Sequence, residues 1–116
     1  MAHGKTINLN DEQEQARLDF RKFKALIATP GNLVTGVKLP ANCILYASTS
    51  AVVAVPIGLI TVNARTLSAS PGAANKIHSY NGVERGRTVT KAASAPGTVR
   101  VYVDNGSGKP ILFAQG

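Results

Sequence analysis

The most constraining feature of this sequence is a succession of short apolar stretches that starts at Asn32 and continues to residue 114. The stretches are rich in the small residue Ala and in Val, Ile and Thr, of which the last three favour extended backbone. Pro, Gly or Asn-Gly separates most of the stretches. We predict strands at Leu33–Leu39, Ile44–Ala47, Ala51–Val55, Leu59–Val62, Lys76–Tyr80, Thr88–Ala92, Val99–Asp104 and Pro110–Ala114. Eight short strands at this spacing are typical of a β-sandwich or barrel, so we expect a mainly β fold.

One stretch has the alternation of a half-buried strand. In Thr98–Val103 three valines alternate with polar or aromatic residues, so the valines are expected to face the core. The turn residues 104–108 then lead into 110–113, which predicts a C-terminal hairpin. By contrast, the small and polar residues 66–75 predict a long surface loop.

The first 29 residues differ from the rest and are predicted to form an arm followed by an amphipathic helix. Asn10 is expected to cap the helix N-terminus, with Gln13 completing a capping box. An apolar stripe at helical spacing consists of Ala16, Phe20, Phe23 and Ile27. Thr29-Pro30-Gly31 should end the helix. The alternative is an extended edge strand over residues 20–28.

Acidic and basic residues are segregated along the chain. The first nineteen residues hold four of the six carboxylates and two basic residues, a net charge of −2. Residues 20–116 hold eleven Lys and Arg against two carboxylates, which gives +9 and a total of +7. We therefore expect two units, an acidic arm with its helix at 1–29 and a basic β-sandwich at 30–116. This division indicates a partner: nucleic acid, an acidic protein surface or the arm of a neighbouring copy.

The residue types that carry enzyme chemistry are sparse and scattered. Beyond residue 19 the carboxylates are Glu84, expected in a surface ion pair, and Asp104, expected in a turn. His3, Cys43 and His78 lack the spacing of a metal site, and no serine lies in a G-x-S-x-G context. We therefore expect a protein that is not an enzyme, without catalytic, metal-binding or cofactor-binding residues.

The cysteine content and hydropathy bear on where the protein is made. The single cysteine, Cys43, excludes an intrachain disulfide and favours a reducing compartment. Residues 1–10 lack the apolar core of a signal peptide. The most apolar stretch, Ala51–Val62, is shorter than the roughly 20 residues that span a bilayer. We expect synthesis in the cytosol and no membrane partner.

Two stretches carry a family resemblance. Gly36–Leu45 opens an apolar strand with Leu-Pro-Ala, and Ala95–Val103 forms a late valine-rich strand. In both, the chain resembles the small capsid decoration (cement) proteins of tailed bacteriophages. The resemblance implies a jelly-roll-like antiparallel β-sandwich that forms a homo-oligomer, a dimer or trimer. It further implies binding to the outer surface of an icosahedral head, where the protein bridges major capsid protein subunits, after synthesis in the host cytoplasm.

Two other function classes remain open. A basic β-barrel that binds nucleic acid is the alternative, because residues 20–116 are so positively charged; its affinity would fall steeply with salt. A small enzyme or sugar-binding protein is the third class, which a pocket lined by Tyr46, Tyr80 or Tyr102 would support.

The residues expected to make contacts are interface residues rather than catalysts. Three apolar residues should dock the helix, on its own body or on a neighbour: Phe20, Phe23 and Ile27. Three arginines are candidates for salt-sensitive contacts: Arg85, Arg87 and Arg100.

Overall fold

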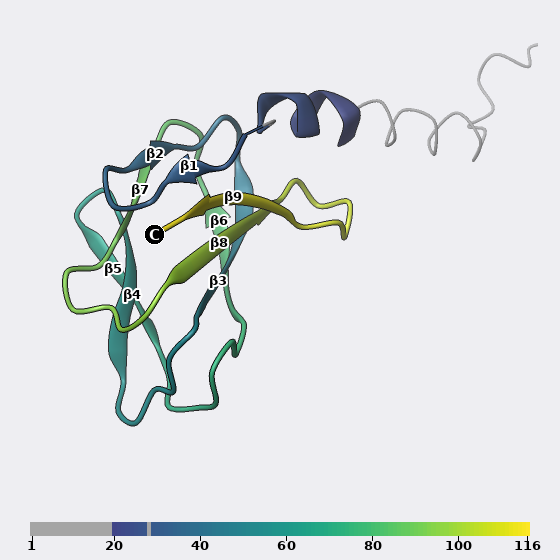
Figure 1. The fold of residues 1–116 in the computed structure, drawn as a ribbon. Helices are drawn as coiled ribbons and strands as arrows, with labels where there is room; N and C mark the ends of the chain where they lie inside the picture. Colours follow the sequence, from purple (N-terminus) through teal and green to yellow (C-terminus); the bar gives the residue numbers. More distant parts are fainter. Residues whose placement is uncertain (1–19, 28) are drawn as a thin grey trace, which may run out of the picture.

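A computed structural model describes residues 20–27 and 29–116 as a sandwich of two β-sheets with a short helix at one end (Figure 1). The five-stranded sheet has the order β1-β9-β8-β3-β6 and the four-stranded sheet the order β2-β7-β4-β5. The strands are β1 Gly31–Asn32, β2 Val37–Lys38, β3 Cys43–Thr49, β4 Ile57–Val62, β5 Arg65–Ala69, β6 His78–Val83, β7 Thr88–Lys91, β8 Val99–Asp104 and β9 Ile111–Gln115. The predicted mainly β sandwich is confirmed.

Strand β3 organises the five-stranded sheet. It pairs antiparallel with β8 from Ile44↔Asp104 to Thr49↔Val99, and antiparallel with β6 on its other side. The strand pairs of both sheets are antiparallel except β1 with β9, which is parallel. The predicted C-terminal hairpin is confirmed as the β8–β9 pair.

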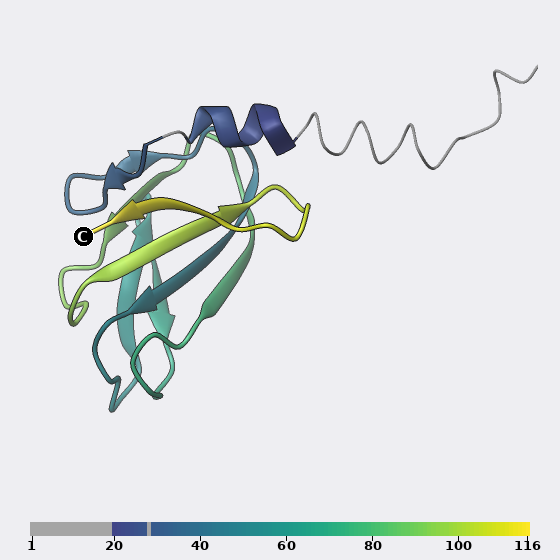
Figure 2. The same ribbon diagram turned by 45° about the vertical axis from the view of Figure 1, so that its right-hand side comes forward.

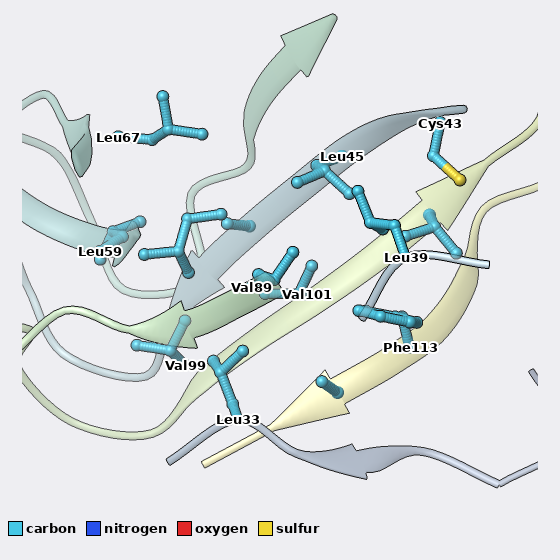
Figure 3. Packing of buried hydrophobic residues seen from close by; sticks show 14 of the residues in the cluster. Leu33, Leu39, Cys43, Leu45, Leu59, Leu67, Val89, Val99, Val101 and Phe113 are labelled. Carbon is cyan, nitrogen blue, oxygen red and sulfur yellow. The ribbon is translucent and has the colours of Figure 1, made fainter. Parts of the chain in front are cut away.

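Aliphatic side chains fill the space between the sheets. The alternation predicted in β8 is confirmed, because its three valines are fully buried whereas Arg100 is exposed. Figure 3 shows valines of β8 beside Leu45 of β3, with Leu59 of β4 and Val89 of β7 on the opposite sheet. Each such side chain contributes about 1.5 to 3 kcal/mol relative to an exposed one.

Residues 20–26 form the helix, which lies at one end of the sandwich with residue 20 at its far end (Figures 1 and 2). Phe23 and Ile27 are buried and belong to the same apolar cluster as the strands, so the helix docks on its own body. Phe20 is half-buried, and the Lys109 ammonium lies 5.5 Å from the centre of its ring. Short helices are marginal in isolation, so these contacts stabilise it.

The helix prediction is confirmed for residues 20–26, and the alternative edge strand is wrong. The apolar stripe accounts for this outcome, since its spacing buries Phe23 and Ile27 on one helical face. The expected cap at Asn10, the capping box at Gln13 and the stripe residue Ala16 lie outside the described residues.

Two of the predicted strands are largely absent. Of the stretch Leu33–Leu39 only Val37–Lys38 forms a strand, β2, because a turn follows β1. In this turn the Asn32 side chain accepts a hydrogen bond from the Val34 amide. Gly36 allows this turn because its φ of 95° lies in the left-handed region. The stretch Ala51–Val55 is a bend, in which Val53 makes an isolated bridge to Gly72.

Two predicted interruptions are also wrong. The expected loop 66–75 contains most of β5, which buries Leu67 and Ala69 although its other residues are exposed. The Asn81-Gly82 pair, expected as a turn, lies inside β6. There the ladder with β3 shifts register, and Gly82 has a φ of 68°. Both a β-bulge and a hairpin turn need a residue with positive φ, and an Asn-Gly pair suits either. The pair alone therefore does not distinguish them.

Cys43 is a buried thiol that donates a hydrogen bond to the backbone oxygen of Ala41 at 3.0 Å. Burial raises the pKa of Cys43 from 9.0 to about 11, and the nearby Asp104 carboxylate adds to the rise. We therefore expect slow alkylation by iodoacetamide at pH 8.5 in the native protein and fast alkylation after unfolding, because the thiolate is the nucleophile.

The same shift predicts the pH dependence of stability. Because the folded pKa exceeds the unfolded one, the contribution of Cys43 is complete below pH 9 and is lost between pH 9 and 11. The Cys43→Ala variant should lack this part of the alkaline loss in denaturant titrations. Equal alkylation rates in the folded and unfolded protein would contradict the assignment.

Candidate functional site

The sandwich is open along one side, where the last strands of the two sheets face each other. Within the described residues, β5 and β6 each pair with one neighbour only. Between them lies a cleft of about 540 Å³. We call it the edge cleft and define it by its lining residues Val62, Arg65, Leu67, Ser79, Tyr80, Asn81, Gly82, Val83, Glu84 and Arg87.

Strand β6 turns its edge, rather than one face, toward the edge cleft. Five consecutive residues, Ser79 to Val83, line it, whereas side chains alternate between the two faces of a strand. Strand β5 contributes Arg65 and Leu67, two residues apart, as expected when one face lines a cleft. The backbone groups on the free border of β6 therefore open onto the cleft, as at any sheet edge.

Tyr80 joins the two sheets across the edge cleft. Its partner in the β3–β6 ladder is the core residue Leu45, so its ring faces inward and packs against the core. Its hydroxyl donates a hydrogen bond to the backbone oxygen of Ser68 on β5 at 3.0 Å. Burial raises the pKa of the Tyr80 phenol, which is a hydrogen-bond donor at neutral pH with or without this shift.

The charged residues of the edge cleft are Arg65, Glu84 and Arg87. The Arg87 guanidinium donates to the Glu84 carboxylate at 3.3 Å, with the side chains 46% and 70% exposed, so the predicted surface ion pair is confirmed. A pair this exposed contributes at most about 1 kcal/mol. Arg65 is also exposed. A carboxylate from a partner can therefore engage these arginines at little cost to the fold.

The three arginines expected to make contacts do not lie together. Arg85 and Arg87 lie in the turn between β6 and β7, where the Arg85 amide donates to the Asn42 side chain at 2.8 Å. Arg100 is exposed on β8 and pairs with Ser48, near the opposite end of β3 from the β6–β7 turn. Ser48 lies five positions along the strand from Cys43, a distance of about 17 Å. Their role as contacts stays a prediction.

Arg65 is a lining residue that the sequence does not predict. The small and polar residues after it indicate a loop, so no strand was expected to place its side chain. The signal that identifies β5 is the alternation of Leu67 and Ala69, both buried, after a turn in which Asn63 has a φ of 54°.

A second surface feature lies at the end of the sandwich opposite the helix, where the loops 50–56 and 70–77 meet (Figure 1). Two backbone hydrogen bonds of 2.9 and 3.0 Å between Val53 and Gly72 hold these loops together. Their exposed large apolar side chains, which we call the apolar tip, are Val52, Val55 and Ile77. Single exposed apolar residues are common, so it is the placement of these three on two joined loops that makes them a candidate contact surface.

The outer face of the five-stranded sheet carries two tyrosines. Tyr46 of β3 and Tyr102 of β8 are directly opposite each other. Both are half-buried, whereas their neighbours along each strand are buried and face the other sheet. Ser48 and Asp104, two residues further along on the same face as the tyrosines, are also buried. Arg100 shares their face. Tyr80 faces inward, so the three tyrosines do not line a common pocket.

The described residues contain no group of three or more His, Cys, Asp or Glu side chains that could hold a metal ion. Among these same residues, the helix is too short and polar to cross a bilayer. Comparison of the chain with known protein families, with curated proteins and with solved structures finds no match. The surface features that bear on function are the edge cleft, the apolar tip and the outer face.

Proposed function

We propose that the protein is a structural virion protein, a decoration (cement) protein that forms homo-oligomers on the outer surface of an icosahedral phage head and bridges major capsid protein subunits. The apolar tip is the observation that carries this proposal. Its three side chains are 71%, 63% and 55% exposed, on loops that backbone hydrogen bonds hold in place. Exposed apolar groups on a rigid support favour docking to another protein.

The positions of the two stretches that carry the resemblance support the same proposal. The first, Gly36–Leu45, leads into β3, and the second, Ala95–Val103, leads into β8. Strand β8 pairs over its whole length with residues 44–49 of β3, in the middle of the five-stranded sheet. The likeness therefore falls on adjacent parts of one framework rather than on unrelated loops.

The test is binding of the purified protein to empty heads assembled from the accompanying major capsid protein, measured by cosedimentation. The triple variant Val52→Asp, Val55→Asp, Ile77→Asp should raise the dissociation constant at least about tenfold, because three charges would have to be desolvated at the contact. The positions are exposed, so the variant should unfold at the denaturant concentration of the unchanged protein.

Val34→Asp provides the matched control. Val34 is 64% exposed on the β1–β2 turn, so the substitution has the same chemistry away from the apolar tip. It should leave head binding unchanged. Absence of head binding by the unchanged protein, or equal weakening by the control, would refute the proposed function.

A nucleic-acid-binding module is the second candidate, favoured by Tyr46, Tyr102 and Arg100 on one sheet face. Aromatic rings beside a cation can stack bases of single-stranded nucleic acid. This function requires salt-dependent binding of single-stranded DNA that Tyr102→Ala weakens and that the apolar-tip variant leaves unchanged. Flat binding curves at low salt would dismiss it.

A further inference from the structure

We propose that the edge cleft binds the N-terminal segment of a second copy of this chain, with residues 6–10 added as a strand to the free border of β6 and the acidic residues 11–14 beside the arginines. This inference rests on the self-association within the proposed function and names the contact that produces it. Backbone, charge and apolar complementarity each support it.

The backbone argument concerns the edge of β6. Because consecutive residues of β6 line the edge cleft, its unpaired border is accessible from the cleft. An extended segment that enters can satisfy these N–H and C=O groups by forming a ladder, the mode known as strand addition. The Gly82 position leaves room, since nothing lies within 4 Å of a Cβ placed there.

The charge argument concerns the arginines. Residues 6–14 contain Asp11, Glu12 and Glu14 and no basic residue. The edge cleft offers Arg65 and Arg87 against the single carboxylate Glu84. Arginine binds carboxylates through paired N–H donors, and opposite charge sets the register of a contact.

The apolar argument concerns the segment before these acids. In the sequence Thr6-Ile7-Asn8-Leu9-Asn10, the two aliphatic residues are two positions apart, so an extended chain presents both on one face. The edge cleft has an apolar side made by Val62, Leu67 and Val83. The apolar residues of this segment therefore match the apolar side of the edge cleft, and the acidic residues that follow them match the arginines.

The described part of the helix favours a second copy over the same chain. Phe23 and Ile27 anchor it to the sandwich, and its end at residue 20 lies away from the sandwich (Figures 1 and 2). An occupant from the same chain would have to turn back from this end.

Single-stranded nucleic acid is a poorer match for the edge cleft. Such ligands need exposed aromatic faces for stacking. Tyr80 is the aromatic residue among the described residues that line the cleft; its ring packs against the core and its hydroxyl is bonded to Ser68. An extended acidic peptide uses the backbone border and the arginines instead.

The test is a charge exchange in the full-length chain, with self-association followed by sedimentation velocity over a range of concentrations. Arg65→Glu with Arg87→Glu should raise the dissociation constant about tenfold or more, and so should Asp11→Lys with Glu12→Lys. All four substitutions in one chain restore opposite charges and should return the constant to within about threefold of the original.

Lys22→Glu with Lys24→Glu is the matched control, because it makes the same change of net charge at exposed positions outside the edge cleft. It should not alter self-association. A monomer at every concentration would overturn the inference, as would unchanged association of the Arg65, Arg87 variant or failure of the four substitutions to restore association.

The outcome also separates this inference from the proposed function. A monomer that binds heads through the apolar tip would refute the edge-cleft contact and leave head binding in place. A chain that passes the charge exchange but does not bind heads would retain the edge-cleft contact and refute the virion role. Single-stranded DNA that competes with self-association would assign the edge cleft to nucleic acid and overturn the inference.

Discussion

Replacing Phe23 by alanine is expected to lower the free energy of unfolding by about 3 kcal/mol, measured by urea titration. Phe23 is 4% exposed and belongs to the core cluster formed by both sheets. Its truncation would leave a cavity between the helix and the sandwich and remove the main anchor of the helix. This loss should outweigh the gain in helix propensity, since alanine is a better helix former than phenylalanine.

Leu26→Ala is the control for this substitution. Leu26 lies on the same helix but is 62% exposed, so its truncation should change the free energy of unfolding by less than about 0.5 kcal/mol. If both variants unfolded at the same urea concentration as the unchanged protein, the helix would not be part of the core. The apolar stripe would then be free to dock on a neighbouring copy, which is the alternative that the sequence leaves open.

The sequence predicts an element well where its apolar residues follow one clear spacing. Strand β8 matches its predicted bounds, because the Val-x-Val-x-Val alternation allows only one buried face. Strand β5 is missed because its Leu67 and Ala69 alternate with Arg, Thr and Ser, a composition that is also typical of loops. Strand β6 is shortened in the prediction because Asn-Gly indicates a turn, whereas the left-handed Gly82 serves a bulge.

The candidate site is less predictable than the fold, since it depends on which strands lie at sheet edges. Arg85 and Arg87 can be selected from the local charge of the sequence. Strand β6 ends one sheet and β5 ends the other. These positions depend on pairings between residues far apart in the sequence, such as Leu45 with Tyr80. The periodicity within a strand does not show which strands will lie beside it. The edge cleft, and the part that Arg65 takes in it, therefore emerge only from the topology.

Replacing Asp104 by alanine is expected to lower the free energy of unfolding by about 2 kcal/mol, the second large effect. Asp104 is 2% exposed at the end of β8, and its carboxylate accepts hydrogen bonds from the amides of Gly106 at 2.8 Å and Gly108 at 3.1 Å. Its position in a turn, predicted from the sequence, is thus confirmed. Alanine would leave these amides without their acceptor in a turn whose two glycines have positive φ.

Two further variants separate the acceptor role of Asp104 from a general effect on the turn. Asp104→Asn keeps one side-chain oxygen and should cost about 1 kcal/mol, roughly half the loss for alanine. Asn105→Ala removes an exposed 3.2 Å hydrogen bond to the Ser107 amide in the same turn, and should cost less than about 0.5 kcal/mol. Equal losses for Asp104→Ala and Asn105→Ala would show that the turn tolerates unpaired amides by exposing them to water. A graded series would instead show that this buried carboxylate fixes the β8–β9 hairpin, whose inner residues belong to the core cluster.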